Sequence, residues 1–322
     1  MSQSKNILIA PLNWGLGHAT RCIPLIRKYI AKGDNVIIAS DGQALELLKK
    51  EFPGLTFEKL PSYNIHYGTT SFLTKVNLLS QVPKIWKVAQ QEKKVTAQLV
   101  NKHNIDLIIS DNRFGVISKE VKSVYITHQL RVLSGLTTQI STFFHRQVYK
   151  QYDEIWVPDF EKDGGLSGRL GHLKNSKLNI KYIGVLSRLK KQKLSKKYDI
   201  LAILSGVEPQ RSILEKELLQ KLAGYQGKTA LVQGVVSENM RQSTINNIDI
   251  YNFLTADKLE NILNESEIVI SRSGYTSLMD YYILNKKILI IPTPGQNEQV
   301  YLGQYFEQKG LGKCQKQSEI SL

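Results

Sequence analysis

Cysteine is scarce in this chain, and long apolar runs are missing. The two cysteines, Cys22 and Cys314, lie far apart and form neither a disulfide framework nor a CxxC metal motif, which favours a reducing cytosol. No segment contains the about 18 consecutive apolar residues that a membrane-spanning helix needs. No apolar signal-peptide core follows Met1 either. We therefore expect a cytoplasmic protein, with a place at the inner face of the membrane as an open alternative.

Nucleic-acid-binding motifs are also missing from the sequence. It has no zinc-finger spacing, no aromatic pattern typical of RNA-recognition domains and no basic helix followed by heptads, so no nucleic acid partner is expected. The chain nevertheless carries a net charge of +15. This excess indicates either a solvated basic surface or attraction to anions such as nucleotide phosphates and anionic lipids. The charge by itself leaves both interpretations open.

Short apolar runs alternate with helical stretches through the first part of the chain. Strands as apolar as these are usually buried on both faces, as in parallel sheets. This alternation predicts a doubly wound α/β domain. The expected strands span residues 6–11, 35–40, 55–59, 106–110, 123–127, 154–157 and 181–184, and the expected helices span residues 17–31, 43–51 and 82–101.

The same pattern restarts after the basic stretch 188–197 (RLKKQKLSKK), which we interpret as a linker. Chains longer than about 250–300 residues usually form more than one domain. We therefore predict an N-terminal domain over residues 1–187 and a C-terminal domain over 198–322, both Rossmann-like and facing a central cleft. A helix over the last part of the second sheet is only weakly indicated. The second set of expected strands spans residues 198–204, 229–233, 248–252, 268–271 and 287–291, and its helices span 212–222 and 277–284.

A glycine-rich turn joins the first strand to the first helix. Gly15 and Gly17 allow a sharp turn, and the free amides of the following helix favour an anion. One interpretation is a dinucleotide-binding turn with Asp41 as the ribose-binding acid, although Thr20 stands where a third glycine is expected. A second interpretation makes His18 a general base. A third is a tight turn with an ordinary surface histidine, and this segment does not decide among them.

Polar residues follow two further strands of the N-terminal domain. Asp111 comes directly after one strand, and His128 follows the next. Because parallel strands end at the same edge of a sheet, these residues are expected near His18, where a carboxylate would orient a histidine base. The alternative is that Asp111 caps a helix and that His128 is a hydrogen-bonded loop residue. The remaining histidines show no partner pattern and are taken as structural: His66, His103, His145 and His172.

The segment 271–280 (SRSGYTSLMD) carries the most specific pattern of the chain. Small polar residues open a helix there and leave amides available for a diphosphate. Asp280 lies one turn beyond Thr276 and is placed to accept ribose hydroxyls. The following strand leads into a predicted loop, 292–299 (PTPGQNEQ), in which Glu298 and Gln299 are available for sugar hydroxyls. The alternative is a capped helix followed by a polar loop.

This C-terminal pattern resembles the donor-binding half of GT-B glycosyltransferases, and in particular the family 28 enzymes that transfer GlcNAc to complete lipid II. The N-terminal pattern G-x-G-H-x-x-R is similar to the first glycine loop of that family. The resemblance covers both ends of the chain. It implies a GT-B fold and transfer of a sugar, GlcNAc or another hexose, from a UDP-sugar to an acceptor hydroxyl on a lipid-linked or other cell-envelope glycan.

The resemblance also assigns roles to individual residues. It implies that His18 is the base, and the strand-end residues Asp111 and His128 stay as further catalytic candidates. Asp280 stands in the place of the family's glutamate, and Glu298 with Gln299 in the place of its paired glutamines. Ser205 and Gly206 occupy the second glycine loop, where the family has more glycines, so Arg211 is expected to supply charge. The implied donor-binding residues are Gly15, Gly17, Ser205, Gly206, Arg211, Arg272, Ser273, Gly274, Thr276, Asp280, Glu298 and Gln299.

The implied reaction is an inverting transfer without a metal or cofactor, since the sequence has no DxD-like motif and no dense cluster of His, Asp and Glu. The segment 72–94 mixes apolar residues with lysines and is interpreted either as a contact for an anionic membrane or as a helix packed on its own domain. Three other functions stay open: a non-hydrolysing nucleotide-sugar epimerase, an NAD-dependent oxidoreductase and a non-catalytic sugar-nucleotide sensor.

Overall fold

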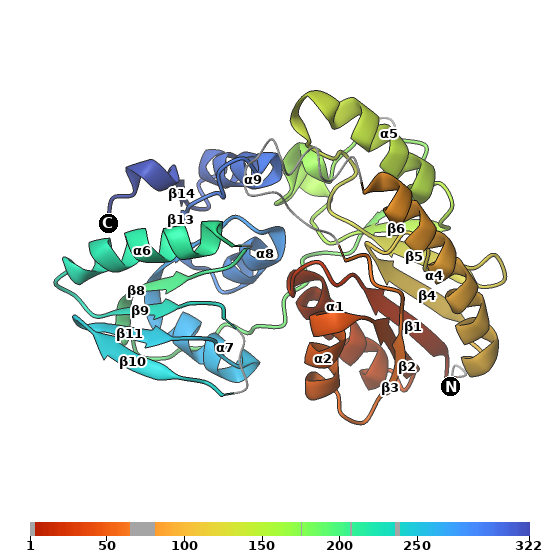
Figure 1. The fold of residues 1–322 in the computed structure, drawn as a ribbon, viewed down its shortest axis with the longest axis horizontal. Helices are drawn as coiled ribbons and strands as arrows, with labels where there is room; N and C mark the ends of the chain where they lie inside the picture. Colours follow the sequence, from red (N-terminus) through yellow and green to blue (C-terminus); the bar gives the residue numbers. More distant parts are fainter. Residues whose placement is uncertain (1–3, 65–80, 175, 207, 236–238) are drawn as a thin grey trace. The chain divides into compact units, whose positions relative to one another are not determined.

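The computed structural model describes residues 4–64, 81–174, 176–206, 208–235 and 239–322. The chain divides into two compact units, Met1–Arg188 and Leu189–Leu322, coloured from red to green and from green to blue (Figure 1). A seven-stranded sheet forms the centre of each unit. The structure therefore has two α/β units of the Rossmann type, each of which is described separately below.

All strands of the N-terminal sheet run parallel, in the order β3-β2-β1-β4-β5-β6-β7. Strand order reverses between β1 and β4, and such a switch point is where ligands bind in doubly wound sheets, beyond the carboxyl ends of the strands. The strands are β1 (Asn6–Pro11), β2 (Asn35–Ser40), β3 (Thr56–Lys59), β4 (Leu107–Asp111), β5 (Lys122–Ile126), β6 (Glu154–Val157) and β7 (Ile180–Tyr182).

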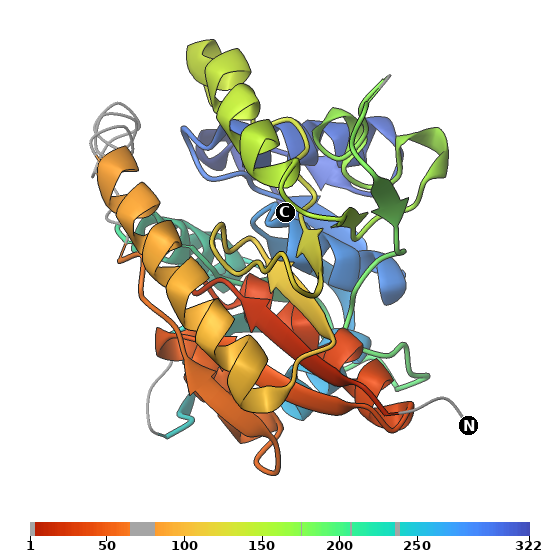
Figure 2. The same ribbon diagram turned by 90° about the vertical axis from the view of Figure 1, so that its right-hand side faces the viewer.

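Helices cover both faces of this sheet. On one face, Leu99 and Val100 pack against Leu8 and Ile108, and Figure 2 shows the orange helix α4 lying across the strands. On the other face, α1 and α2 contact β1 and β2. In the described part of this unit the helices are α1 (Gly17–Ala31), α2 (Gly42–Glu51), α4 (Val82–His103) and α5 (Thr138–Tyr149), with short 3₁₀ turns at Gly135–Thr137, Lys162–Gly164 and Gly168–Leu170.

The C-terminal sheet has the order β10-β11-β9-β8-β12-β13-β14, and only the edge strand β10 runs antiparallel to its neighbour. Its order reverses between β8 and β12. The strands are β8 (Tyr198–Ile203), β9 (Thr229–Val232), β10 (Gln242–Ile245), β11 (Ile248–Tyr251), β12 (Ser266–Ser271), β13 (Lys287–Ile290) and β14 (Lys313–Cys314). The helices are α6 (Gln210–Ala223), α7 (Ala256–Asn264), α8 (Tyr275–Ile283) and α9 (Asn297–Gln308), followed by a 3₁₀ turn at Gln317–Glu319.

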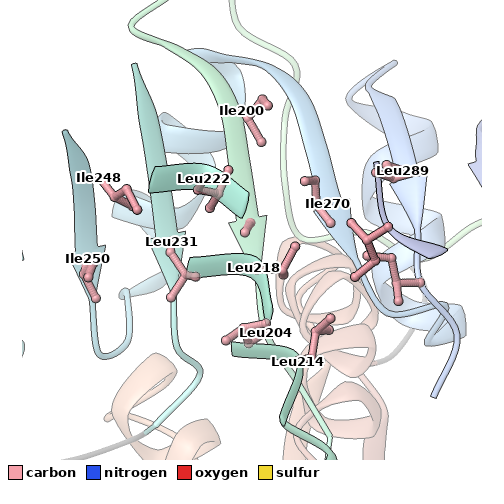
Figure 3. Close-up of a cluster of buried hydrophobic side chains, with 13 residues drawn as sticks. Ile200, Leu204, Leu214, Leu218, Leu222, Leu231, Ile248, Ile250, Ile270 and Leu289 are labelled. Atoms are coloured by element: carbon pink, nitrogen blue, oxygen red, sulfur yellow. The ribbon is translucent and has the colours of Figure 1, made fainter. Parts of the chain in front are cut away.

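One apolar cluster joins α6 to the C-terminal sheet (Figure 3). Leu214, Leu218 and Leu222 recur every four residues, so they share one face of the helix and are buried together. They pack on the side chains of neighbouring strands, among them Leu231 of β9 and Ile270 of β12. This packing fixes where α6 begins, and hence where the loop between β8 and α6 lies.

Several elements differ from the sequence prediction. Residues 297–299, predicted to end a loop, form the first turn of α9, and that helix packs against β14 although its sequence signal is weak. Its buried side chains are only Leu302 and Phe306, and most of its other residues are polar. Helices α5 and α7 and strands β10 and β14 were not predicted. Within the described ranges, each helix is too short or too polar to cross a bilayer.

The basic stretch 188–197 contains no helix or strand, yet it is bound to the C-terminal unit over most of its length. Asn264 donates to the Lys190 carbonyl (3.0 Å) and accepts from the Gln192 amide (2.9 Å). The Lys197 amide donates to the Glu265 carbonyl at 2.8 Å. Backbone hydrogen bonds of this kind hold an irregular segment in place without any regular secondary structure.

Candidate functional site

Loops at the carboxyl edge of the N-terminal sheet bring the predicted residues His18 and Asp111 together. Gly15 has a φ of +74°, which glycine adopts without strain, and this turn leads directly into α1. His18 stands in the first turn of α1. Asp111 ends β4, where it pairs in register with Pro11 of β1. The two side chains therefore meet at the point where the strand order reverses.

His18 and Asp111 are joined by a side-chain hydrogen bond. The Nδ1 atom of His18 lies 2.8 Å from Oδ1 of Asp111. Arg21, one turn further along α1, donates through Nε to Oδ2 of Asp111 at 2.6 Å and through Nη2 to Oδ1. The side chains of Arg21 and Asp111 are 1% and 0% exposed, whereas that of His18 is 15% exposed. Only the histidine is thus accessible from solvent.

The pKa values of this cluster follow from burial and from Arg21. Burial opposes ionisation of Asp111, but Arg21 and His18 hold the pKa of its carboxyl well below the ordinary value. Burial and then the positive charge of Arg21 lower the pKa of His18, and these effects exceed the opposite effect of Asp111. At neutral pH the pair is therefore an ionised carboxylate and a neutral imidazole. Since Nδ1 faces the carboxylate, it carries the proton, and Nε2 is the nitrogen that can accept one.

His128 lies beside this pair but contacts a different partner. Its Nδ1 atom is 3.3 Å from Nη1 of Arg21, and its side chain is buried. The guanidinium of Arg21 is therefore a partner of His128, whereas a carboxylate was the expected partner of a histidine base. The sequence pattern G-x-G-H-x-x-R contains Arg21, but no role was predicted for this residue. The three-residue spacing, which places Arg21 one helical turn after His18, could have indicated that the two side chains lie on the same face of the helix.

Arg113, which follows Asp111 closely, belongs to a second buried cluster. It donates to Oδ1 of Asp41 (2.6 Å), to Oε1 of Glu92 (2.7 Å) and to the Pro61 carbonyl (2.6 Å). The second oxygen of Asp41 accepts from the Ser62 hydroxyl at 2.6 Å. Both oxygens of Asp41 are thus engaged within the protein, which argues against a ribose-binding acid and against the NAD-dependent interpretation.

Three histidines that were taken as structural have partners in the structure. His103 lies 2.7 Å from Glu58, and His172 lies 3.2 Å from Asp159. His145 is 2.8 Å from the Ser141 carbonyl of its own helix. His66 lies outside the described residues.

In the C-terminal unit, α6, α8 and α9 are among the helices that begin at the carboxyl edge of the sheet. The loops after β8, β12 and β13 lead into α6, α8 and α9, and β12 lies between the other two strands. Ser205 and Gly206 are exposed directly after β8, and Gly206 has a φ of +103°. Gly274 precedes α8 in an extended conformation. The first amides of α6 and α8 thus flank the switch point, where free amides favour an anion.

Arg272 holds these loops together. Its guanidinium is buried and donates to the Gln210 carbonyl at 2.9 Å and to the carbonyls of Ile291 (3.2 Å) and Pro292 (3.1 Å). It also donates to Oε1 of Gln317 at 2.9 Å. Burial lowers the pKa of Arg272 to about 10. These contacts join the start of α6 to the loop after β13, and the expected contact of Arg272 with the donor stays a prediction.

Ser273 and Gln299 also make contacts within the protein. The Ser273 hydroxyl donates to the Gln299 carbonyl at 2.7 Å. The side chain of Gln299 accepts from the Thr293 amide (2.9 Å) and donates to Gln296 (2.6 Å). Because the side-chain amide of Gln299 already bridges the loop that leads into α9, its contacts fix the shape of that loop.

The remaining predicted donor residues stand at defined positions around these loops. Thr276 and Asp280 are half-buried on α8, and Glu298 is half-buried in the first turn of α9. Arg211, expected to supply positive charge, is paired with Glu208 and with Glu215 at 2.7 Å. Two carboxylates that lie close to Arg211 in sequence therefore compensate its charge.

Comparisons with known proteins agree with this architecture. Residues 203–322 match the glycosyltransferase family 28 C-terminal domain. An uncharacterized glycosyltransferase of Methanosarcina acetivorans is 22% identical over 330 residues, which cover 95% of this chain and 84% of that protein. The UDP-N-acetylglucosamine–N-acetylmuramyl-(pentapeptide) pyrophosphoryl-undecaprenol N-acetylglucosamine transferase of Staphylococcus saprophyticus is 22% identical over 312 residues, covering 92% of this chain and 82% of that protein.

The fold is also found among solved structures. The glycotransferase of kitacinnamycin superposes with a TM-score of 0.67 over 99% of this chain and 88% of that one, at 13% sequence identity. Identity this low supports the fold alone, while the family match covers the C-terminal loops and helices described above. Taken together, the two parallel-dominated sheets and these similarities identify the chain as a glycosyltransferase with the GT-B fold, whose C-terminal unit resembles glycosyltransferase family 28.

Proposed function

We propose that this glycosyltransferase moves a sugar, GlcNAc or another hexose, from a UDP-sugar to an acceptor hydroxyl. The observation that carries the proposal is the family 28 match over residues 203–322, which contain the starts of α6, α8 and α9 at the carboxyl edge of the C-terminal sheet. The N-acetylglucosamine transferase among the relatives supports GlcNAc as the first sugar to test. In this proposal the N-terminal unit serves the acceptor and the C-terminal unit holds the donor.

The donor diphosphate is assigned to the loops before α6 and α8. Amides at the start of a helix carry partial positive charge and are not used within the helix, so they stabilise an anion. Gly274 leaves the start of α8 unobstructed, since its nearest side-chain neighbour is 4.0 Å from the position of an added Cβ. Asp280 is proposed to accept the ribose hydroxyls, and Glu298 to accept sugar hydroxyls. Ser273, Arg272 and Gln299 are proposed to hold the loops in shape.

His18 is the proposed base. The acceptor oxygen attacks the anomeric carbon, the bond from that carbon to the diphosphate oxygen breaks, and the acceptor proton moves to Nε2 of His18. A single displacement of this kind inverts the anomeric configuration. Asp111 keeps the proton on Nδ1 and stabilises the imidazolium that forms, and this type of proton transfer contributes about 10²–10⁴-fold to a rate. Arg21 is proposed to position Asp111.

We propose that the leaving diphosphate is stabilised by helix amides and not by a metal ion. Support comes from the side chains themselves: no group of three or more His, Cys, Asp or Glu residues within the described ranges is arranged to hold a metal. Addition of a chelator is therefore expected to leave the transfer rate unchanged. A rate that falls with EDTA and recovers with Mg²⁺ would contradict this part of the proposal.

A lipid-linked acceptor at an anionic membrane is supported by two apolar surfaces of the N-terminal unit. Part of the predicted segment 72–94 lies outside the described residues, but Trp86 in the first turns of α4 is 59% exposed and has Lys84 and Lys87 nearby in sequence. On α5, Phe143 and Phe144 are 58% and 64% exposed. Exposed aromatic side chains, which on α4 stand beside lysines, are typical of surfaces that lie on a membrane interface. Sedimentation with phosphatidylglycerol vesicles at low salt tests this contact, and a protein that stays in the supernatant would exclude it.

The test of the function uses purified full-length protein, a panel of UDP- and TDP-sugars and a lipid-linked acceptor fraction. Transfer is followed by mass spectrometry of the acceptor, and donor binding by the rise in melting temperature that a native-state ligand produces. His18→Ala is expected to lower kcat by about 10²–10⁴-fold without a loss of donor binding. His103→Ala is the matched control, since it removes a histidine of the same unit that pairs with Glu58 on the edge strand β3. Full turnover by H18A would exclude His18 as the base.

Two other functions are separated by the same materials. An epimerase converts UDP-GlcNAc into an isomer without any acceptor, so incubation with the donor alone identifies it. A non-catalytic sensor binds a nucleotide sugar and leaves it unchanged under all conditions. Transfer that requires an acceptor and yields free UDP supports the proposal over both.

A further inference from the structure

A basic pocket lies at the end of the C-terminal sheet opposite the proposed donor loops. It has a volume of about 330 Å³, and its lining includes Lys191, Lys196, Asn264 and Lys286. These residues precede β8, β12 and β13, whereas the donor loops follow the same three strands. A six-residue strand such as β8 is about 20 Å long at 3.3 Å per residue, so the two locations are separate.

Two ammonium groups converge on the same backbone oxygens in this pocket. The Nζ atoms of Lys196 and Lys286 donate to the Ser266 carbonyl at 2.8 Å and 2.6 Å. Both also reach the carbonyl of Asn264, the last residue of α7, at 2.9 Å and 3.5 Å. One ammonium group suffices to satisfy carbonyls at the end of a helix, so a helix cap explains one lysine and not both.

Positive charge in the pocket exceeds what the protein compensates. Lys287 is paired with Glu267 at 2.9 Å. Among the residues that the structure describes, Lys191, Lys196 and Lys286 have no carboxylate within ion-pair distance. Burial and the nearby ammonium of Lys196 lower the pKa of Lys286 to about 7, which reflects the cost of holding these charges together. A bound anion would remove this repulsion.

We propose that this pocket is a binding site for a phosphate group, separate from the site of sugar transfer. Lys196 and Lys286 would bind the phosphate oxygens through charge-assisted hydrogen bonds, with Lys191 adding charge at the rim. Asn285 lines the same pocket and offers its amide group to the rest of the ligand. The volume exceeds that of the phosphate alone and falls in the range of small-molecule sites, which favours a phosphate monoester of a small molecule.

The test is isothermal titration of the full chain with inorganic phosphate, in chloride buffer of matched ionic strength. Lys286→Gln is expected to weaken phosphate binding about 10–100-fold, the loss expected for a charge-assisted hydrogen bond. Lys191→Gln lies at the exposed rim, does not disturb the carbonyl contacts, and is expected to weaken binding by a smaller factor. Lys193→Gln is the matched control, because Lys193 is exposed in the same segment and does not line the pocket.

The outcomes distinguish the source of the phosphate and the validity of the site. Weaker phosphate binding in K286Q and K191Q but not in K193Q supports the site. If these two variants also lose sedimentation with phosphatidylglycerol vesicles, a lipid headgroup is the ligand; if sedimentation is unchanged, the ligand is a soluble phosphate ester. Equal phosphate affinity in all variants, or no binding beyond that in chloride, overturns the proposal. None of these results depends on transferase activity.

Discussion

Replacing Asp111 with asparagine is expected to destabilise the N-terminal unit strongly at neutral pH. The carboxylate is fully buried and accepts hydrogen bonds from Arg21 and His18. Removing one member of a buried ion pair costs about 3–5 kcal/mol, because the other charge stays buried without compensation. For a unit of this size, each kcal/mol lowers Tm by about 2–4 °C. The expected decrease is therefore about 6–20 °C in differential scanning calorimetry at pH 7.

The pH dependence of this effect has a definite sign. Because the pKa of Asp111 in the folded protein lies below that of an unfolded aspartate, near 3.9, the ion pair contributes its full stability above about pH 4. That contribution is lost as pH falls through the lowered pKa. The Tm difference between wild type and D111N is therefore expected to be constant from pH 5 to pH 8 and to shrink in more acidic buffer.

An exposed carboxylate of the same unit is the control for D111N. Glu46 on α2 pairs with Lys49 and is 64% exposed, so Glu46→Gln is expected to change the free energy of unfolding by less than about 0.5 kcal/mol. A D111N protein that melts within 2 °C of wild type would refute the account of the buried cluster. A Tm difference that grows toward acidic pH would refute the sign derived for its pKa.

Three further predictions follow from described contacts. Since burial and Arg21 lower the pKa of His18, kcat/KM of the proposed transfer should fall only below about pH 6.5. A fall in kcat/KM that is centred above pH 7 would contradict the assignment of His18 as the base. Arg113→Met leaves two buried carboxylates unpaired and should cost about 3–5 kcal/mol in urea denaturation, whereas a cost below 1 kcal/mol would show that this cluster relaxes. Leu218→Ala, at a fully buried position of the α6 cluster, should cost about 2–5 kcal/mol by the same method, and an unchanged midpoint would contradict the packing.

Most of the sheet strands were predicted from sequence because they are short apolar runs bounded by polar or glycine residues. β1, β2 and β6 have the predicted bounds, and the other predicted strands differ by one or two residues at their ends. The exceptions are informative. β10 is exposed at every residue and β14 has only two residues, so neither has the apolar pattern that indicates a buried strand.

The helix α9 shows why local patterns fail near the candidate site. Its first turn lies in a stretch rich in polar residues and closely follows Gly295, a pattern that predicts a loop. Leu302 and Phe306 are buried by contacts with the sheet, and the loop before the helix is held by Gln299 and Ser273. Tertiary contacts of this kind stabilise a helix whose own sequence favours it only weakly.

The sequence by itself determined the alternation of strands and helices and the positions of polar residues at strand ends, because both depend on local hydrophobic periodicity. His18, Asp111 and His128 were identified as site candidates in this way. Only the tertiary structure decided which of them touch: Arg21 occupies both oxygens of Asp111, and His128 faces Arg21. Such contacts join residues about a hundred positions apart, and they arise from the order of strands in the sheet, which no local pattern encodes.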